Sequence, residues 1–180
     1  MTAFPRLSIV VPLFNEEESA RSLVEAVRAA IPPDLTWELV LIDDGSSDAT
    51  AVVVGELAIE DPRIRFLRLA RNYGQTQAMQ AGFDAARGDI VVSMDGDLQN
   101  DPLDIPKLVR KLDEGFDLVT GYRAQRQDRL MSRKMPSWVS NRPIPWRSGV
   151  SIPDNRYPPQ AVPRGPPQAH HPTPPLHPFP

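Results

Sequence analysis

Short apolar runs and segments of helix length alternate along the first 120 residues of this chain. Runs rich in Val, Ile and Leu are typical of strands buried on both faces, and strands joined by helices form crossover units with parallel neighbours. The expected strands are residues 7–11, 37–42, 64–69, 89–94 and 117–120, and the expected helices are residues 15–31, 49–61, 75–86 and 102–114. The alternation predicts an α/β fold, with a mostly parallel open sheet and helices on both faces.

The first expected helix has start and stop signals in the sequence. Asn15 is a good N-cap residue, and the three glutamates after it suit the positive end of a helix dipole. Pro12 is expected to close the preceding strand, and Pro32 and Pro33 are expected to end the helix.

Composition restricts the class of protein. With 180 residues and no cysteine, the chain has room for one domain with a sizeable core and cannot form disulfides. No apolar run reaches transmembrane length and no signal peptide is recognisable, so we expect a soluble, cytoplasmic protein.

The charged residues of the first part of the chain are mostly acidic. Residues 1–130 carry 14 Lys and Arg against 22 Asp and Glu. This acidic balance argues against a nucleic-acid partner, because phosphate binding needs concentrated basic residues.

The character of the sequence changes after about residue 130. Residues 136–180 hold 14 of the 21 prolines, and residues 131–180 carry six Lys and Arg against one acidic residue. Because each proline removes a backbone donor, we expect residues 158–180 to form a Pro-rich irregular tail, disordered or polyproline. Three histidines lie in this tail and are expected to be solvated rather than to bind zinc: His170, His171 and His177. The basic end is compatible with a membrane surface as a partner.

The fourth expected strand ends in two carboxylates one residue apart, Asp95 and Asp97. Side chains two residues apart in an extended segment point the same way, so the two charges favour a cation between them. Mg²⁺ is usually held by one or two carboxylates together with substrate phosphates, which makes the pair a candidate metal site. An acidic surface turn is the alternative interpretation of the same residues.

Acidic residues also follow the first two strands, as Glu16 after the first and as Asp43 and Asp44 after the second. The carboxyl ends of parallel strands meet at one edge, where open α/β sheets bind ligands. A nucleotide with a metal-bound diphosphate suits this edge, because its base and ribose donate hydrogen bonds and its phosphates help to coordinate the metal. A plain turn before the next helix is the alternative for Asp43 and Asp44.

Missing motifs argue against several other classes of protein. The chain contains no G-x-x-x-x-G-K-[ST], so a P-loop phosphotransferase is not supported. The turn after the first strand lacks the G-x-G-x-x-G of a dinucleotide-binding fold. There is no G-x-S-x-G and no histidine before His170, so a serine hydrolase would have no base.

Four segments resemble the motifs of family 2 glycosyltransferases with the GT-A fold: residues 10–16 (VVPLFNE), 41–48 (LIDDGSSD), 71–75 (RNYGQ) and 94–99 (MDGDLQ). The branch that this chain resembles is that of the polyprenyl-phosphate sugar transferases, which includes dolichyl-phosphate mannose synthase and bacterial undecaprenyl-phosphate glycosyltransferases. The resemblance implies that residues 1–130 form a nucleotide-sugar-binding GT-A domain. Residues 131–157 would be a remnant of the acceptor-binding segment, because they follow the family pattern only as far as Asn155.

The resemblance also implies a nucleoside site. Pro12, Phe14 and Glu16 would help to frame the nucleoside. Asp43 would bind its base or ribose, and Asp44 would support that pocket.

Further residues would act on the phosphates and the sugar. Asp95 would contact the ribose or the metal, Asp97 would bind the metal, and Gln99 would lie beside the reacting sugar. Arg123 matches a family arginine near the phosphates, with a surface arginine as the alternative.

The implied reaction is an inverting transfer of a sugar from a UDP- or GDP-sugar to a polyprenyl phosphate, assisted by Mg²⁺ or Mn²⁺, at the cytoplasmic face of a membrane. A lipid phosphate is already an anion at pH 7, so it needs no strong general base. Two alternatives stay open: an inactive nucleotide-sugar-binding domain, and an interaction module that works through the Pro-rich residues 158–180.

Overall fold

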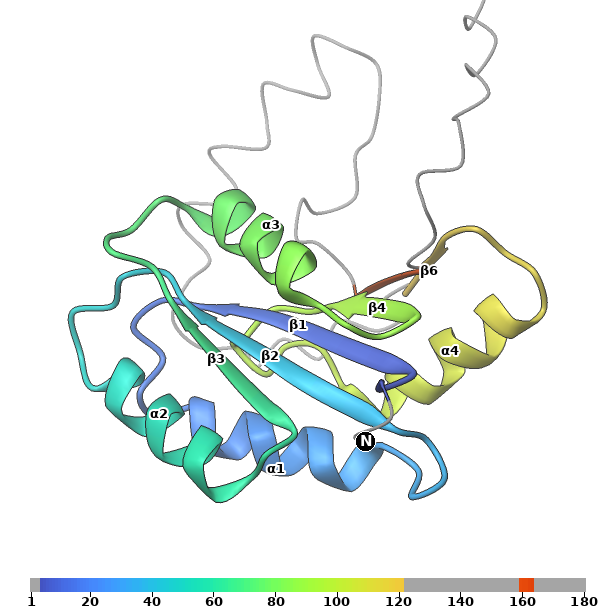
Figure 1. The fold of residues 1–180 in the computed structure, drawn as a ribbon, viewed down its shortest axis with the longest axis horizontal. Helices are drawn as coiled ribbons and strands as arrows, with labels where there is room; N and C mark the ends of the chain where they lie inside the picture. The colour runs from blue at the N-terminus through green and yellow to red at the C-terminus, as the bar shows by residue number, and fades with distance from the viewer. Residues whose placement is uncertain (1–3, 122–158, 164–180) are drawn as a thin grey trace, which may run out of the picture.

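The computed structural model describes residues 4–121 and 159–163, which form a six-stranded sheet flanked by helices (Figure 1). The strands are β1 (Leu7–Leu13), β2 (Trp37–Asp43), β3 (Ile64–Arg68), β4 (Ile90–Ser93), β5 (Val119–Thr120) and β6 (Gln160–Pro163). The helices are α1 (Ala20–Ala30), α2 (Thr50–Glu60), α3 (Gln75–Ala85) and α4 (Ile105–Asp113), with a 3-10 turn, η1 (Pro102–Asp104), before α4. The predicted α/β fold is confirmed.

The strand order in the sheet is β3-β2-β1-β4-β6-β5. β1 pairs in parallel with β2 on one side and with β4 on the other, and β2 pairs in parallel with β3. β6 is antiparallel to both of its neighbours, β4 and β5. As a result, the carboxyl ends of β2, β1 and β4 lie side by side at one edge of the sheet.

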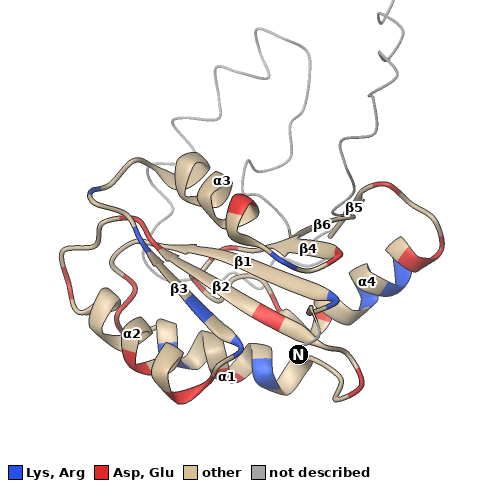
Figure 2. Cartoon of the chain, in the orientation of Figure 1, with Lys and Arg blue, Asp and Glu red and all other residues tan. Residues whose placement is uncertain are grey.

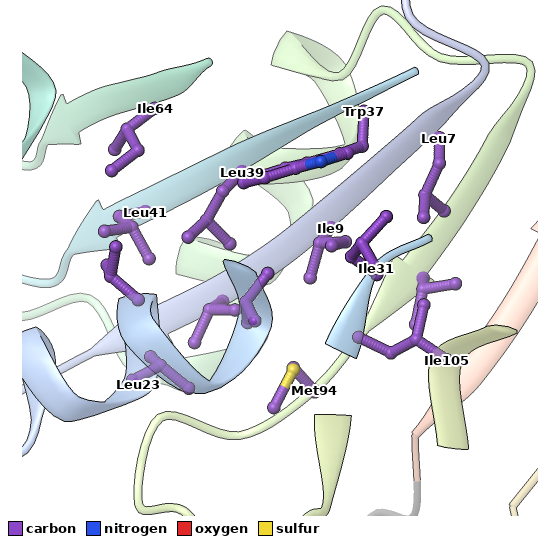
Figure 3. Close-up of a cluster of buried hydrophobic side chains, with 14 of the residues drawn as sticks. Leu7, Ile9, Leu23, Ile31, Trp37, Leu39, Leu41, Ile64, Met94 and Ile105 are labelled. Carbon is purple, nitrogen blue, oxygen red and sulfur yellow. The ribbon is translucent and has the colours of Figure 1, made fainter. Parts of the chain in front are cut away.

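Alternation along the strands divides the core into two layers. Odd-numbered residues of β1 and β2 pack against α1, α2 and α4, whereas even-numbered residues pack against α3. The larger layer includes Ile9, Leu23, Trp37, Leu39, Met94 and Ile105 (Figure 3). None of the helices in residues 4–121 is both long and apolar enough to cross a membrane.

The start of the first helix differs from the prediction. β1 continues through Pro12 to Leu13, and α1 begins at Ala20. Pro12 is accommodated because β4 pairs with β1 only as far as Val10, so that Pro12 has a neighbouring strand on one side only. Asn15 has a φ of 54° and does not cap the helix, so the prediction of an N-cap there is wrong. Its side chain is used instead in a contact between two loops.

The expectation of irregular structure is also wrong for residues 160–163, which form β6. Ala161 is fully buried opposite Val92, and this short stretch completes the sheet between β4 and β5. Its only proline, Pro163, stands at the end of the strand, where a lost backbone donor matters least. The remainder of the predicted tail and the predicted acceptor remnant, residues 131–157, lie outside the described residues.

Candidate active site

A cavity of about 430 Å³ opens at the edge of the sheet where β1, β2 and β4 end. The last residues of β1, the loops after these three strands and the segment that leads into the first residue of α3 line it. Six of the predicted site residues are among them: Pro12, Phe14, Glu16, Asp44, Asp95 and Asp97. The structure therefore brings together carboxylates from three separate strand ends, as the parallel topology predicts.

Hydrogen bonds join the loop after β1 to the loop after β2. The Asn15 N–H donates to Ser46 Oγ at 2.9 Å, and the Ser47 N–H donates back to Asn15 Oδ1 at 2.9 Å. The Glu16 N–H donates to Thr50 Oγ1 at 2.8 Å. These three hydrogen bonds fix the backbone from which Glu16 reaches the cavity. Both loops carry several acidic residues (Figure 2).

Asp48 strengthens this junction at the start of α2. Its Oδ1 accepts hydrogen bonds from the Thr50 N–H at 3.0 Å and from the Thr50 hydroxyl at 2.5 Å. Partial burial would raise the pKa of Asp48, but these bonds, together with the bond from the Glu17 N–H, hold it below its ordinary value. Asp48 therefore supports the loop that carries Asp44.

Asp44 has a double role at the cavity wall. Its carboxylate is buried and accepts hydrogen bonds from the N–H groups of Tyr73 at 2.8 Å and Gly74 at 2.9 Å. The next residue, Gly45, lies so close to the same segment that a Cβ there would be 2.3 Å from the backbone carbon of Arg71. Asp44 thus lines the cavity and also anchors the segment that leads into α3.

The turn after β4 presents the two acidic residues of the predicted metal site. Asp95 is half-buried and Asp97 is exposed, and both line the cavity. The Gln99 N–H donates to Asp97 Oδ1 at 3.1 Å, and Leu98 between them has a φ of 56°, in the left-handed region that a leucine rarely adopts. The turn therefore holds Asp97 in place through its own backbone.

Five cavity residues had no role assigned from the sequence: Leu13 and Gly96, which neighbour predicted site residues, and Asn72, Gly74 and Gln75. The last three belong to the segment 71–75, whose motif was visible in the sequence, although its position relative to the carboxylates was not. Gln75, the first residue of α3, donates a hydrogen bond from Nε2 to Asp95 Oδ1 at 2.7 Å.

The structure does not place the remaining predicted residues on the cavity wall. Asp43 is fully buried; its Oδ1 accepts from the Ser46 N–H at 3.0 Å, and its Oδ2 lies 3.6 Å from Arg68 Nε and makes no hydrogen bond within the described ranges. Gln99 is exposed and is not among the lining residues. Arg123 lies outside the described residues. Their roles stay predictions.

The donor set of the cavity fits a divalent cation that is held partly by a substrate. No Lys or Arg is among the lining residues of the described part of the chain. Asp95 and Asp97 lie on one turn and both line the cavity, so they are the pair of carboxylates that one cation could share. Residues 4–121 and 159–163 contain no cluster of three or more potential metal ligands. Two carboxylates suffice for Mg²⁺ or Mn²⁺ when substrate phosphates supply further oxygen ligands.

Solved structures share this fold. The mannosyltransferase PcManGT from Pyrobaculum calidifontis, solved in complex with GDP-Man and Mn²⁺, superposes with a TM-score of 0.60 at 24% identity over 68% of this chain and 36% of its own. Staphylococcus aureus TarS in complex with UDP gives a TM-score of 0.56 at 22% identity over 67% of this chain and 38% of its own. At these identities the likeness establishes the fold alone.

Sequence comparison with curated proteins establishes the family. Dodecaprenyl-phosphate galacturonate synthase from Rhizobium johnstonii is 50% identical over 151 residues, which cover 82% of this chain and 45% of that protein. Undecaprenyl-phosphate 4-deoxy-4-formamido-L-arabinose transferase from Salmonella paratyphi A is 43% identical over 151 residues, covering 83% of this chain and 46% of that protein. The chain thus spans less than half the length of these relatives. Residues 8–164 match the family described as glycosyl transferase family 2, and the chain belongs to that family.

Proposed function

We propose that this protein transfers a sugar from a nucleotide-diphosphate sugar to a polyprenyl phosphate. The observation that carries the proposal is the cavity: carboxylates from the ends of β1, β2 and β4 line it, and no basic side chain does so within the described ranges. A diphosphate cannot bind next to so much negative charge without a cation. The names of the curated relatives, which are sugar transferases acting on dodecaprenyl or undecaprenyl phosphate, support the choice of acceptor.

Asp95 and Asp97 would hold Mg²⁺ or Mn²⁺ between the protein and the donor diphosphate. When bound, the metal supplies charge neutralisation for the departing nucleoside diphosphate and a template for its phosphates. Pro12, Phe14 and Glu16 would then frame the nucleoside. Asp43 would accept a hydrogen bond from the base or ribose. Its buried Oδ2 lies 3.6 Å from Arg68 Nε but accepts no hydrogen bond in the described part of the chain, which supports this expectation.

The reaction would be a single displacement. A phosphate oxygen of the acceptor attacks the anomeric carbon, the bond from that carbon to the diphosphate breaks, and the nucleoside diphosphate leaves. The configuration at the anomeric carbon is therefore inverted. Because the second pKa of a phosphate monoester is about 6, the acceptor is largely dianionic at pH 7 and needs no strong base. We place Gln99 beside the sugar and Arg123 beside the phosphates as predictions, and place the reaction at the cytoplasmic face of the membrane that holds the acceptor.

The proposal is tested by supplying radiolabelled UDP- and GDP-sugars, including galacturonate and 4-deoxy-4-formamido-L-arabinose donors, with undecaprenyl phosphate in detergent. We expect metal-dependent transfer of label into the lipid fraction by the wild-type chain, and its loss in Asp97→Ala. Asp84→Ala, at an exposed position of α3, is the matched control and should transfer normally. Turnover that persists in excess chelator or in Asp97→Ala would contradict the metal-assisted mechanism.

A further inference from the structure

We infer that Gln75 is a positioning residue for Asp95, which it holds in the orientation needed for metal binding. The inference rests on the proposed donor site and extends it to a residue outside the predicted metal pair. The Gln75 side-chain amide donates to Asp95 Oδ1 at 2.7 Å, and both residues line the cavity. A hydrogen bond of this length restricts rotation of the carboxylate about its side-chain torsions.

The backbone that leads into Gln75 is itself held by a second cavity residue, Asp44. Asp44 accepts hydrogen bonds from the N–H groups of Tyr73 and Gly74, the two residues that precede Gln75. Asp44 follows β2 and Asp95 follows β4, and β1 lies between these two strands in the sheet. The segment 73–75 therefore bridges the carboxyl end of β1 and links the two acidic strand ends that flank it.

The chemical nature of this residue fits the role. A lysine or arginine at this position would orient Asp95 as well, but its charge would compete with a divalent cation for the same carboxylate. The amide of glutamine donates a hydrogen bond to Asp95 without adding a positive charge that would repel the cation. Partners that orient a metal-binding side chain in this way typically change metal affinity or activity by about 10–100-fold when they are removed.

The test is a titration of the purified chain with Mn²⁺, followed by electron paramagnetic resonance, in the presence of UDP and, separately, GDP. We expect Gln75→Leu to raise the dissociation constant for Mn²⁺ by about tenfold or more. Gln75→Asn keeps the amide but shortens the side chain by one methylene, so it should weaken Mn²⁺ binding in the same way. Thermal unfolding of each variant without ligand should match that of the wild-type chain, because Gln75 is exposed.

The chain offers a matched control on the same helix. Gln80 donates from Nε2 to Asp84 Oδ1 at 2.9 Å, which is the same chemical pair at an exposed position away from the cavity. Gln80→Leu should leave Mn²⁺ affinity unchanged. If Gln75→Leu binds Mn²⁺ as tightly as Gln80→Leu, the positioning role is wrong while the proposed donor site stands. If the wild-type chain binds no Mn²⁺ with either nucleotide, both fail.

Discussion

Gly96 lies directly against Leu13, so that a Cβ at position 96 would be 2.3 Å from Leu13 Cδ2. Leu13 is the last residue of β1 and is 1% exposed, which leaves it little space to move away. The same Cβ would lie 3.2 Å from the carbonyl oxygen of Pro12. Because of this close approach, the turn that carries Asp95 and Asp97 packs against the end of β1, next to the residues expected to frame the nucleoside.

Gly96→Ala should therefore displace the acidic turn. We expect a loss of about 1–3 kcal/mol in the free energy of unfolding, the usual cost of adding a methyl group to a tightly packed site, together with weaker metal-dependent nucleotide binding. Urea denaturation measures the first effect and nucleotide titration the second. Gly55→Ala is the control. Gly55 lies within α2, and a Cβ there would lie 4.0 Å from Phe66, so this substitution should stabilise the chain by about 0.5–1 kcal/mol. Equal stability of Gly96→Ala and wild type would show that the contact is not restrictive.

Asp44→Asn should loosen the segment before α3. The carboxylate has an oxygen for each of the N–H groups of Tyr73 and Gly74, whereas an amide would turn its own NH₂ group toward one of them. The expected cost is about 1–3 kcal/mol in unfolding free energy, because a partly buried hydrogen bond to a charged carboxylate is lost. Denaturant unfolding gives the value, and Asp84→Asn at an exposed position supplies the baseline. A cost no larger than that of Asp84→Asn would rule out the anchoring role of Asp44.

The stability of the fold should depend on pH through Asp61. The hydrogen bond from the Arg63 guanidinium lowers the pKa of Asp61 to about 2, against the effect of burial, and Arg28 adds a further bond at 2.9 Å. An unfolded aspartate titrates near pH 3.9, so the folded state gains stability above about pH 4 and loses it as the pH falls toward 2. The contribution is on the order of 1–2 kcal/mol, because Arg63 is half-exposed and solvent screens the pair.

This dependence is measured by comparing wild type with Asp61→Asn in denaturant at pH values from 2 to 7. The difference in unfolding free energy should be constant above about pH 5 and should shrink at lower pH. Asp113→Asn, which removes an exposed ion pair with Arg6, should show a much smaller difference throughout. A difference between wild type and Asp61→Asn that does not change with pH would contradict the assigned pKa.

The parallel part of the sheet was predictable because its signals are local. Each of β1 to β4 is a short apolar run, and each is followed by a helix with its own apolar face. β6 was not predictable in the same way. Its four residues are short, contain a proline and come after a long interval in the sequence, so only pairing with β4 and β5 defines them as a strand.

The loop after β1 shows how tertiary contacts override a local signal. The sequence favours Asn15 as a helix cap, but Ser46 and Ser47 from the next loop offer hydrogen bonds that compete with capping. Since these partners are more than 30 residues away, the sequence around Asn15 holds no sign of them. The helix therefore begins five residues later than predicted, at Ala20.

The parallel topology predicts that acidic residues meet at one edge of the sheet. It does not predict which of them line the cavity or which side chains contact them. Asp43 is the last residue of β2 and Asp44 is the first residue after it, and side chains of adjacent residues in an extended segment point to opposite sides. The sequence gives no indication that Asp44, rather than Asp43, lines the cavity. The contact between Gln75 and Asp95 depends on how the loop before α3 crosses β1, which local sequence patterns do not specify.

The most direct test of the proposed donor site is thermal unfolding of the purified chain with UDP or GDP, with and without Mn²⁺. A ligand at 100 times its dissociation constant stabilises the folded state by about 2.7 kcal/mol, which is a readily measured shift in the transition temperature. We predict a shift with one nucleotide that requires Mn²⁺, is lost in Asp97→Ala and is kept in Asp84→Ala. A cooperative transition that no nucleotide moves in the presence of Mn²⁺, or an equal shift in Asp97→Ala, would contradict the account.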